Sequence, residues 1–260
     1  MEQFRDDSTS EAKRAFREFP HDRLFLRDAL SRADGNLFID RWPDPTVWLL
    51  RNQQRHTSFI VGECPTAGFI PEAAASLQAD QWGPCLSLPS ESWQQSLSDR
   101  FGELFHFGEP MITFQNLDPV QLRAAEKPSD LSGEFKLVQL AVRHLEQIRP
   151  RGWADPIHFI EQSVGFGVVD RADQIASYAL SNFMLDDAVE VAVETQPEYR
   201  RRGFARLAAS ALLNFSLRKG LVPQWTSWAG NLEACSLARD LGFRDEHPHT
   251  WAFVRPRVQN

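Results

Sequence analysis

The residues Arg200-Arg201-Arg202-Gly203-Phe204-Ala205 have types and a spacing suited to binding an anion. At the start of a helix the first N–H groups have no intrahelical partner and lie at the positive end of the macrodipole. Gly203 and Ala205 leave room for a phosphate to approach the backbone, and the arginines add charge and bidentate donors. The alternative is a helix start beside a solvated basic run, and the hexapeptide alone does not distinguish the two.

A strand must precede this turn and a helix must follow it. Residues 188–195 alternate between two faces, and Glu190 and Glu194 share one of them. Pro197 ends the predicted strand. Apolar residues then recur at helical spacing through residues 206–219. The pattern predicts a strand, a tight basic turn and an amphipathic helix.

A second block, residues 231–243, predicts another helix. Asn231 is a favourable N-cap, and Gly242 is placed to end the helix. Between these two positions apolar residues recur at i, i+3, i+4 and i+7, namely at Ala234, Leu237, Ala238 and Leu241.

In these segments the sequence resembles the GCN5-related N-acetyltransferase (GNAT) superfamily over residues 133–256. Arg200-x-x-Gly203-x-Ala205 fits its Q/R-x-x-G-x-G/A signature, and residues 194–200 resemble the V-x-P-E-Y-R lead-in. Residues 231–243 resemble its N-x-x-A-x-x-L-(Y)-x-x-L-G-F segment. Residues 223–231 resemble a branch that includes acetyltransferases related to zwittermicin resistance proteins.

The resemblance implies an α/β fold on a mixed sheet and acetyl-coenzyme A as cosubstrate, with its pyrophosphate on the basic turn. Its pantetheine arm would pair with strand 188–195, and the Val193 N–H would donate to the thioester oxygen. This requires the neighbouring strand, residues 222–227, to diverge. The implied cofactor-binding residues are Val191, Val193, Thr195, Arg200, Arg201, Arg202, Gly203, Phe204, Ala205, Arg206, Asn231 and Ser236.

Acetyl transfer to an amine needs a base, and Glu194 and Glu190 are the candidate catalytic residues. One carboxylate would take the ammonium proton and the other would bind a cationic acceptor, with Glu194 nearer the turn. The alternative is that they are solvated strand residues or partners of nearby arginines. Many members have a tyrosine as the acid in the last helix, and here that position is Ala238.

The composition excludes several other classes. The chain has 260 residues, 42% hydrophobic and 24% charged, with a formal net charge of -7 and a pI of about 5.5. An acidic chain is poorly suited to nucleic acid. Three isolated cysteines predict neither a zinc site nor a disulfide framework, and we expect no metal. With no signal peptide and no apolar run of transmembrane length, we expect a cytoplasmic protein that does not bind membranes.

We expect an N-terminal α/β domain at residues 1–117, a linker at 118–133 and a GNAT domain at 134–260. In the first domain we expect strands at 47–50, 58–62, 85–89 and 111–115 and a helix at 91–101. By analogy of fold alone, it is interpreted as a degenerate GNAT-like unit that shapes the acceptor site.

Further elements are expected in the second domain. The patterns predict helices at residues 143–148 and 155–162, strands at 163–170 and 174–184, and a last strand at 251–254.

The leading hypothesis is an N-acetyltransferase that acts on a primary amine of a small molecule. Ala238 keeps open a non-catalytic module that binds coenzyme A for regulation or interaction. A third hypothesis, an aminoacyl transferase built from paired GNAT-like halves, is disfavoured by the negative charge. The acceptor and the oligomeric state, with a homodimer as one option, stay open.

Overall fold

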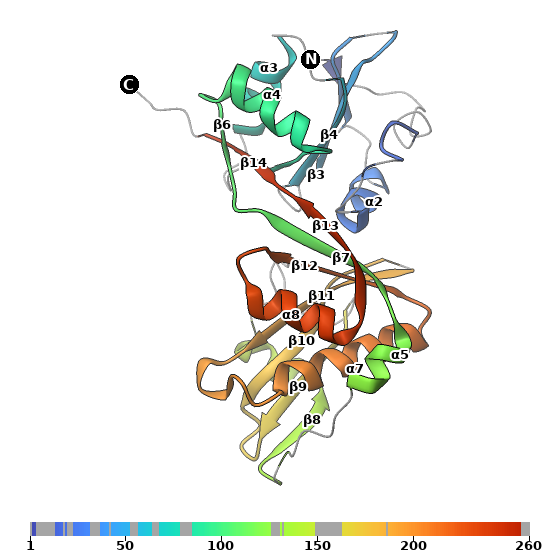
Figure 1. Ribbon diagram of the computed structural model, residues 1–260, viewed down its shortest axis with the longest axis vertical. Helices are drawn as coiled ribbons and strands as arrows, with labels where there is room; N and C mark the ends of the chain where they lie inside the picture. The colour runs from blue at the N-terminus through green and yellow to red at the C-terminus, as the bar shows by residue number, and fades with distance from the viewer. Residues whose placement is uncertain are drawn as a thin grey trace. The chain divides into compact units, whose positions relative to one another are not determined.

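The structure is a computed structural model, and it divides the chain into two compact units. The first contains Met1–Met111 and His247–Asn260, and the second contains Ile112–Glu246 (Figure 1). The structure describes residues 2–3, 14–17, 19, 23–31, 37–41, 43–52, 57–63, 68–78, 85–125, 131, 133–148, 163–185 and 187–255.

A seven-stranded mixed sheet forms the centre of the second unit. Its order is β13-β7-β12-β11-β10-β9-β8. The pairs β8–β9, β9–β10 and β10–β11 are antiparallel, whereas the pair β11–β12 is parallel. The bounds are β7 Met111–Leu117, β8 Phe135–Gln139, β9 Gly165–Asp170, β10 Ile175–Met184, β11 Ala188–Thr195, β12 Val222–Trp228 and β13 Phe243–His249.

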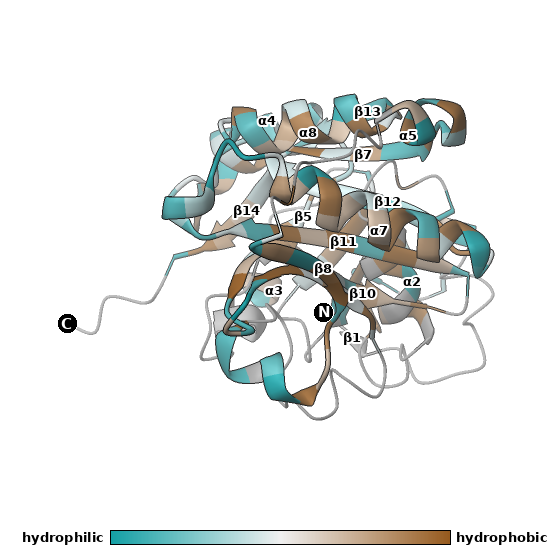
Figure 2. Ribbon diagram, turned by 90° about the horizontal axis from the view of Figure 1, so that it is seen from below, coloured by the Kyte–Doolittle hydropathy of each residue, from teal (hydrophilic) through white to brown (hydrophobic). Residues whose placement is uncertain are grey.

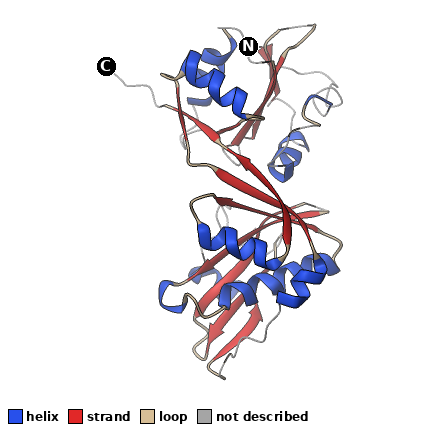
Figure 3. Cartoon of the chain, in the orientation of Figure 1, coloured by secondary structure: helices blue, strands red, loops and turns tan. Residues whose placement is uncertain are grey.

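Two helices, α7 (Phe204–Arg218) and α8 (Leu232–Leu241), pack on one face of this sheet. Figure 2 shows hydrophobic and hydrophilic residues along α7, as expected of a helix with one apolar face. That face places Ala208, Leu212 and Leu213 in a core with Val191 and Trp225. The shorter helices are α5 (Pro119–Ala125), the 3₁₀ helix η1 (Val142–Gln147) and η2 (Pro197–Tyr199) (Figure 3).

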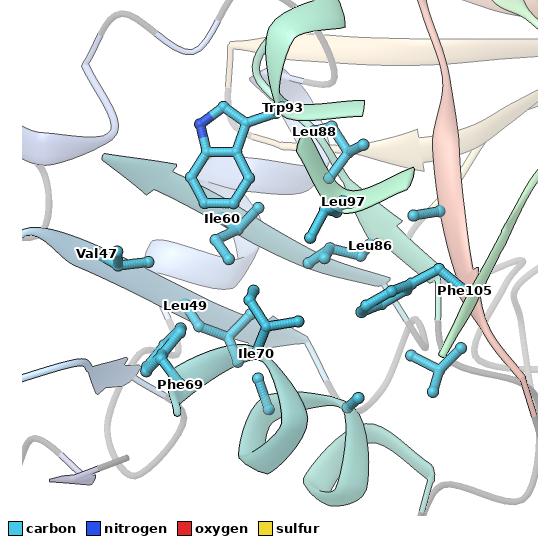
Figure 4. Packing of buried hydrophobic residues seen from close by; sticks show 14 residues of the cluster. Val47, Leu49, Ile60, Phe69, Ile70, Leu86, Leu88, Trp93, Leu97 and Phe105 are labelled. Atoms are coloured by element: carbon cyan, nitrogen blue, oxygen red, sulfur yellow. The ribbon is translucent and has the colours of Figure 1, made fainter. Parts of the chain in front are cut away.

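The first unit has its own seven-stranded sheet, in the order β1-β2-β3-β4-β5-β14-β6. Its helices are α2 (Arg23–Ser31), α3 (Phe69–Gln78) and α4 (Glu91–Phe101). Figure 4 shows its buried core, in which α3, α4 and strand residues such as Ile60 meet. The strands are β1 Glu2–Gln3, β2 Leu37–Ile39, β3 Val47–Asn52, β4 Thr57–Gly62, β5 Cys85–Ser87, β6 Phe105–Phe107 and β14 Trp251–Val254.

The two sheets repeat one topology. Each has three successive antiparallel pairs followed by a parallel pair, β4–β5 in the first and β11–β12 in the second. In each, the strand after the parallel pair comes from a distant part of the chain, β14 in the first unit and β7 in the second. The N-terminal half therefore has the strand order of a second unit of the same kind.

This arrangement differs from the domain boundaries expected from the sequence. Strand β7 joins the sheet of the second unit, and the expected linker contains α5. The last strand, β14, belongs to the first unit and pairs with β5 and β6. A local pattern identifies each strand, but pairing across the chain decides which sheet it joins.

Most expected elements of the second unit are present, with three differences. Helix α7 begins at Phe204, two residues earlier than predicted. Residues 142–147 form a 3₁₀ helix. Residues 243–249, for which no element was expected, form strand β13, which ends at His247-Pro248-His249. The helix predicted at residues 155–162 lies outside the described residues.

Candidate functional site

The turn before α7 is open at its glycine. Gly203 has φ 80°, and Arg201 before it has φ 63°. A Cβ atom added at Gly203 would meet no atom within 4 Å. The Leu207 N–H makes the first helical bond, to the Gly203 carbonyl at 3.1 Å. The N–H groups of residues 204–206 therefore precede the helical ladder, as an anion site at a helix start requires.

The four arginines around this turn are held differently. The Arg202 guanidinium lies 4.7 Å from the ring centroid of Phe135 and 4.8 Å from that of Phe204, an aromatic environment that anchors the turn. Arg206 pairs with Asp240 on α8. Arg200 donates from Nε to the Thr195 carbonyl at 3.4 Å. Arg201 is exposed and has no carboxylate partner among the described residues.

Strands β11 and β12 separate just before this turn. Their register runs from Ala188 opposite Val222 to Val191 opposite Trp225, and it stops there. Strand β11 continues to Thr195. Its last four residues therefore have no register partner on β12, in agreement with the divergence of β12 expected from the sequence.

The alternation of β11 shows which peptide groups face the separation. The Gln196 N–H donates to the Ala176 carbonyl on the β10 side. In an antiparallel pair, peptide groups of alternate residues point to the same neighbour, so Glu194 also faces β10. Val193 and Thr195 face the opposite side, where β12 has diverged. Val191 is the last residue paired with β12.

The two candidate carboxylates lie on the same face of the sheet in different surroundings. Glu194 is exposed, and its Oε2 accepts a 2.6 Å hydrogen bond from the Tyr178 hydroxyl. Tyr178 lies directly opposite on β10 and is buried. Glu190 is buried, with 4% of its surface exposed, and its register partner on β12 is Gln224.

Helix α8 begins at the far side of the separation. The Asn231 side chain accepts from the Ala234 N–H at 3.2 Å, so its oxygen caps the helix as predicted. Ser236 is exposed, whereas Cys235 is buried, and burial raises the pKa of its thiol. Ala238 is fully buried in the core, where a tyrosine would need space that neighbouring side chains occupy.

Two polar residues beside the candidate carboxylates did not emerge from the sequence. Tyr178 and Gln224 lie within strand patterns, and although Gln224 belongs to the segment 223–231, no local pattern assigns either side chain a role. Only the pairing of β10 with β11, and of β11 with β12, brings them next to Glu194 and Glu190. A register prediction could have found them, because residues directly opposite each other share a face.

The described residues contain no group of three or more His, Cys, Asp or Glu side chains that could hold a metal ion. None of the helices in the described ranges has the length and apolar character needed to cross a bilayer.

The open basic turn and the separating parallel strands define a GNAT-type fold. A family model for GNAT acetyltransferases matches residues 13–251, so the chain belongs to this family. The match includes both units, in agreement with their shared strand order.

Two curated relatives match shorter segments. The uncharacterized N-acetyltransferase YdfB of Bacillus subtilis is 29% identical over 98 residues, 38% of this chain. The [ribosomal protein bS18]-alanine N-acetyltransferase of Salmonella typhimurium is 30% identical over 74 residues, 28% of this chain. The matched segments span 37% and 50% of these relatives' own lengths.

Solved structures match along nearly the whole chain. A GCN5-related N-acetyltransferase-like protein from Streptococcus suis has a TM-score of 0.69 at 19% identity, over 96% of this chain and 99% of its own. A tandem GNAT protein from the clavulanic acid biosynthesis pathway has a TM-score of 0.59 at 13% identity, over 97% and 95%. At these identities the likeness establishes the fold.

Proposed function

We propose that this protein is an N-acetyltransferase that moves an acetyl group from acetyl-coenzyme A to a primary amine of a small molecule. Membership of the family supports the reaction class. The observation that carries the proposal is the end of the β11–β12 register at Val191, close in sequence to an open, basic helix start. One element exposes backbone for a pantetheine arm, and the next exposes N–H groups for a diphosphate.

The described residues fit acetyl-coenzyme A. The N–H groups of Gly203, Phe204, Ala205 and Arg206 would receive the pyrophosphate, and Arg200 and Arg201 would add charge from the exposed side of the turn. Arg202 would act by anchoring the turn through its aromatic contacts. Val193 and Thr195 present backbone toward the diverged side, while Asn231 and Ser236 lie on the helix across from it.

Acetyl-coenzyme A supplies a thioester whose carbonyl carbon a neutral amine attacks. The protein must hold the amine against that carbon, remove its proton and stabilise negative charge on the carbonyl oxygen. The Val193 N–H is the proposed donor to that oxygen, because it points away from β10. Since Ala238 is buried, we assign no residue of α8 to protonation of the leaving thiolate, whose thiol pKa is about 8.5.

The surroundings of the two carboxylates suggest separate roles. Glu194 is exposed, oriented by Tyr178 and closer to the turn, as a base that returns its proton to water requires. Glu190 is buried beside Gln224, where a carboxylate would attract a cationic acceptor. We propose Glu194 as the base and Glu190 as the group that binds the amine.

The acceptor is proposed to be a small cationic amine. Two carboxylates on one face of the sheet favour a positively charged molecule. The resemblance of residues 223–231 to resistance acetyltransferases favours the amine of a metabolite or antibiotic. One matched relative is named as acting on an alanine of a ribosomal protein, so a peptide N-terminus belongs in the test panel.

The test combines calorimetry with thiol release from acetyl-coenzyme A over a panel of amines. We expect micromolar cofactor binding and turnover with at least one amine. Glu194→Gln should lower kcat by about 100-fold if it is the base, and Glu190→Gln should mainly raise KM. Glu198→Gln, an exposed glutamate on η2, is the matched control and should change neither constant. Absence of cofactor binding would reject the proposal.

The second candidate function is a non-catalytic module that binds coenzyme A. Its support is the buried Ala238 at the position where many family members have a tyrosine. Tight cofactor binding without thiol release on any amine, peptide N-termini included, would favour this function.

A further inference from the structure

A row of polar side chains crosses the sheet of the second unit. Trp225 belongs to the core beneath α7, so its neighbours in sequence, Gln224 and Thr226, lie on the opposite face. On the same face, Gln115 of β7 donates from Nε2 to Gln224 Oε1 at 3.5 Å. The hydroxyls of Thr113 and Thr226 are 3.2 Å apart. The interior of a sheet face is usually apolar, so this row needs an explanation.

Gln224 is the member of this row with an unused donor. Only 5% of its surface is exposed, and its Nε2 has no hydrogen-bond partner among the described residues. Its other amide atom, Oε1, accepts from Gln115, which orients the NH₂ group away from β7. Burying an amide without a partner costs free energy, so a buried orphan donor points to a missing ligand atom.

The position of Gln224 connects it with the proposed reaction. It is the register partner of Glu190, one step before the last pair, Val191 and Trp225. Along this face, burial decreases toward the strand ends. Glu190 and Gln224 are buried, Thr226 is half-buried, and Glu194 is exposed. The row therefore opens toward the separation where the thioester would lie.

We infer that Gln224 is a specificity-determining residue that donates a hydrogen bond to an oxygen atom of the acceptor. This inference rests on the proposed function. Glu190 would bind the amine, and Gln224 is its register partner on the adjacent parallel strand, at the spacing of neighbouring strands, about 4.8 Å. A single small acceptor can reach both only if its oxygen is close to its amine. The acceptor class is therefore an amine with a hydroxyl or carbonyl oxygen on the neighbouring carbon.

The experiment compares matched acceptors, 2-aminoethanol with n-propylamine and alaninamide with 3-methyl-2-butylamine, by thiol release from acetyl-coenzyme A. The variant is Gln224→Met, which keeps the length of the side chain and removes the amide, both its oxygen and its NH₂ group. We expect the ratio of kcat/KM for oxygen-bearing over oxygen-free amine to fall at least tenfold, with little change for the oxygen-free amines. Comparing the ratio between variant and wild type cancels the differences in amine basicity.

Gln121→Met is the matched control. Its amide donates to the carbonyls of Arg239 and Asp240, so the substitution removes a structural bond elsewhere in the same unit. It should leave the ratio unchanged. An equal loss for both kinds of amine in Gln224→Met would assign the residue a structural role and overturn the inference. If wild type binds the cofactor but acetylates no amine, the proposed function fails first and the inference fails with it.

Discussion

The two units share a strand order but differ at the turn that follows the parallel strand. Helix α7 starts at Gly203-Phe204-Ala205, and helix α3 starts at Gly68-Phe69-Ile70. Gly203 has a left-handed backbone, whereas Gly68 does not. The basic residues before Gly203 have no counterpart, because Pro65-Thr66-Ala67 precedes Gly68. The first unit therefore has a glycine at the start of its helix but lacks the positive charge that precedes Gly203.

A second difference lies in the separation of the parallel strands. In the first unit, the β4–β5 register stops at Phe59 opposite Ser87, and β4 continues to Gly62. The Trp93 indole N–H donates to the Gly62 carbonyl at 3.1 Å, and its ring is buried in the core near Ile60 (Figure 4). The separation is therefore occupied by protein.

The equivalent residue of the second unit is small. Trp93 is the third residue of α4, and its N–H bonds the Ser90 cap. The third residue of α8 is Ala234, whose N–H bonds the Asn231 cap. Separated strands alone therefore do not make a cofactor site. The side chain at the separation and the residues before the helix together determine whether this space can bind a ligand or is filled by the hydrophobic core.

The largest expected effect comes from closing the turn. Gly203→Glu adds bulk and a negative charge at a residue with positive φ, and it should abolish coenzyme A binding, a loss of more than 100-fold by calorimetry. The same substitution in the first unit, Gly68→Glu, should leave affinity unchanged, because no atom lies within 4 Å of an added Cβ there either.

Gly203→Ala separates backbone strain from charge in this experiment. It carries the strain of the left-handed backbone without the carboxylate, so it should weaken binding less than Gly203→Glu does. Equal affinity in wild type and Gly203→Glu would remove the cofactor site from this turn.

A smaller effect should follow from giving the second unit the tryptophan of the first. Ala234→Trp places an indole at the separation of β11 and β12, and we expect coenzyme A affinity to fall about tenfold or more. Ala234→Ser is the control, because serine is close in size to the native alanine and should leave the affinity unchanged. Thermal unfolding without cofactor should show that Ala234→Trp is folded. Unchanged affinity in a folded Ala234→Trp would show that the size of this residue does not determine cofactor binding.

The smallest effect concerns pH. The Arg239 hydrogen bonds lower the pKa of Glu246, and those of Arg244 lower the pKa of Asp118, so the folded state binds fewer protons than the unfolded state. Their stabilisation is present above the unfolded pKa, about 4, and is lost as pH falls through the lower folded value. Both pairs are exposed, so the contribution is small.

Amide hydrogen exchange in α8 measures this contribution. The protection factor, which is the intrinsic exchange rate at each pH divided by the observed rate, should fall a few-fold between about pH 5 and pH 3, and Glu246→Gln should flatten that dependence. A dependence of the same steepness in Glu246→Gln would assign it to other groups. Exchange in α4 provides the comparison within the first unit, because neither ion pair involves that helix.

The sequence predicted the local elements around the site well. The alternation of residues 188–195, the cap at Asn231 and the turn at Gly203 depend on short-range chemistry, and the structure has β11, α8 and a left-handed glycine there. The expected divergence of the next strand is confirmed by the register that stops at Val191. The roles of the individual site residues stay predictions.

Features that depend on long-range pairing could not be predicted from the sequence. Nothing near β14 indicates that it joins the first unit, and nothing near Tyr178 indicates that it faces Glu194. The arginine run looked uniform, yet Arg202 lies against aromatic rings and Arg206 pairs with Asp240. Such partners are brought close by the register of the sheet and by the packing of helices that lie far apart in the chain.

The place of β14 between β5 and β6 has a consequence for biosynthesis. Domains usually fold in the order in which they leave the ribosome. Here the sheet that contains the earliest strand stays open until residues 251–254 have been translated. Nascent chains stalled before this point should therefore expose the edges of β5 and β6 and depend on chaperones, although most of that half was made long before.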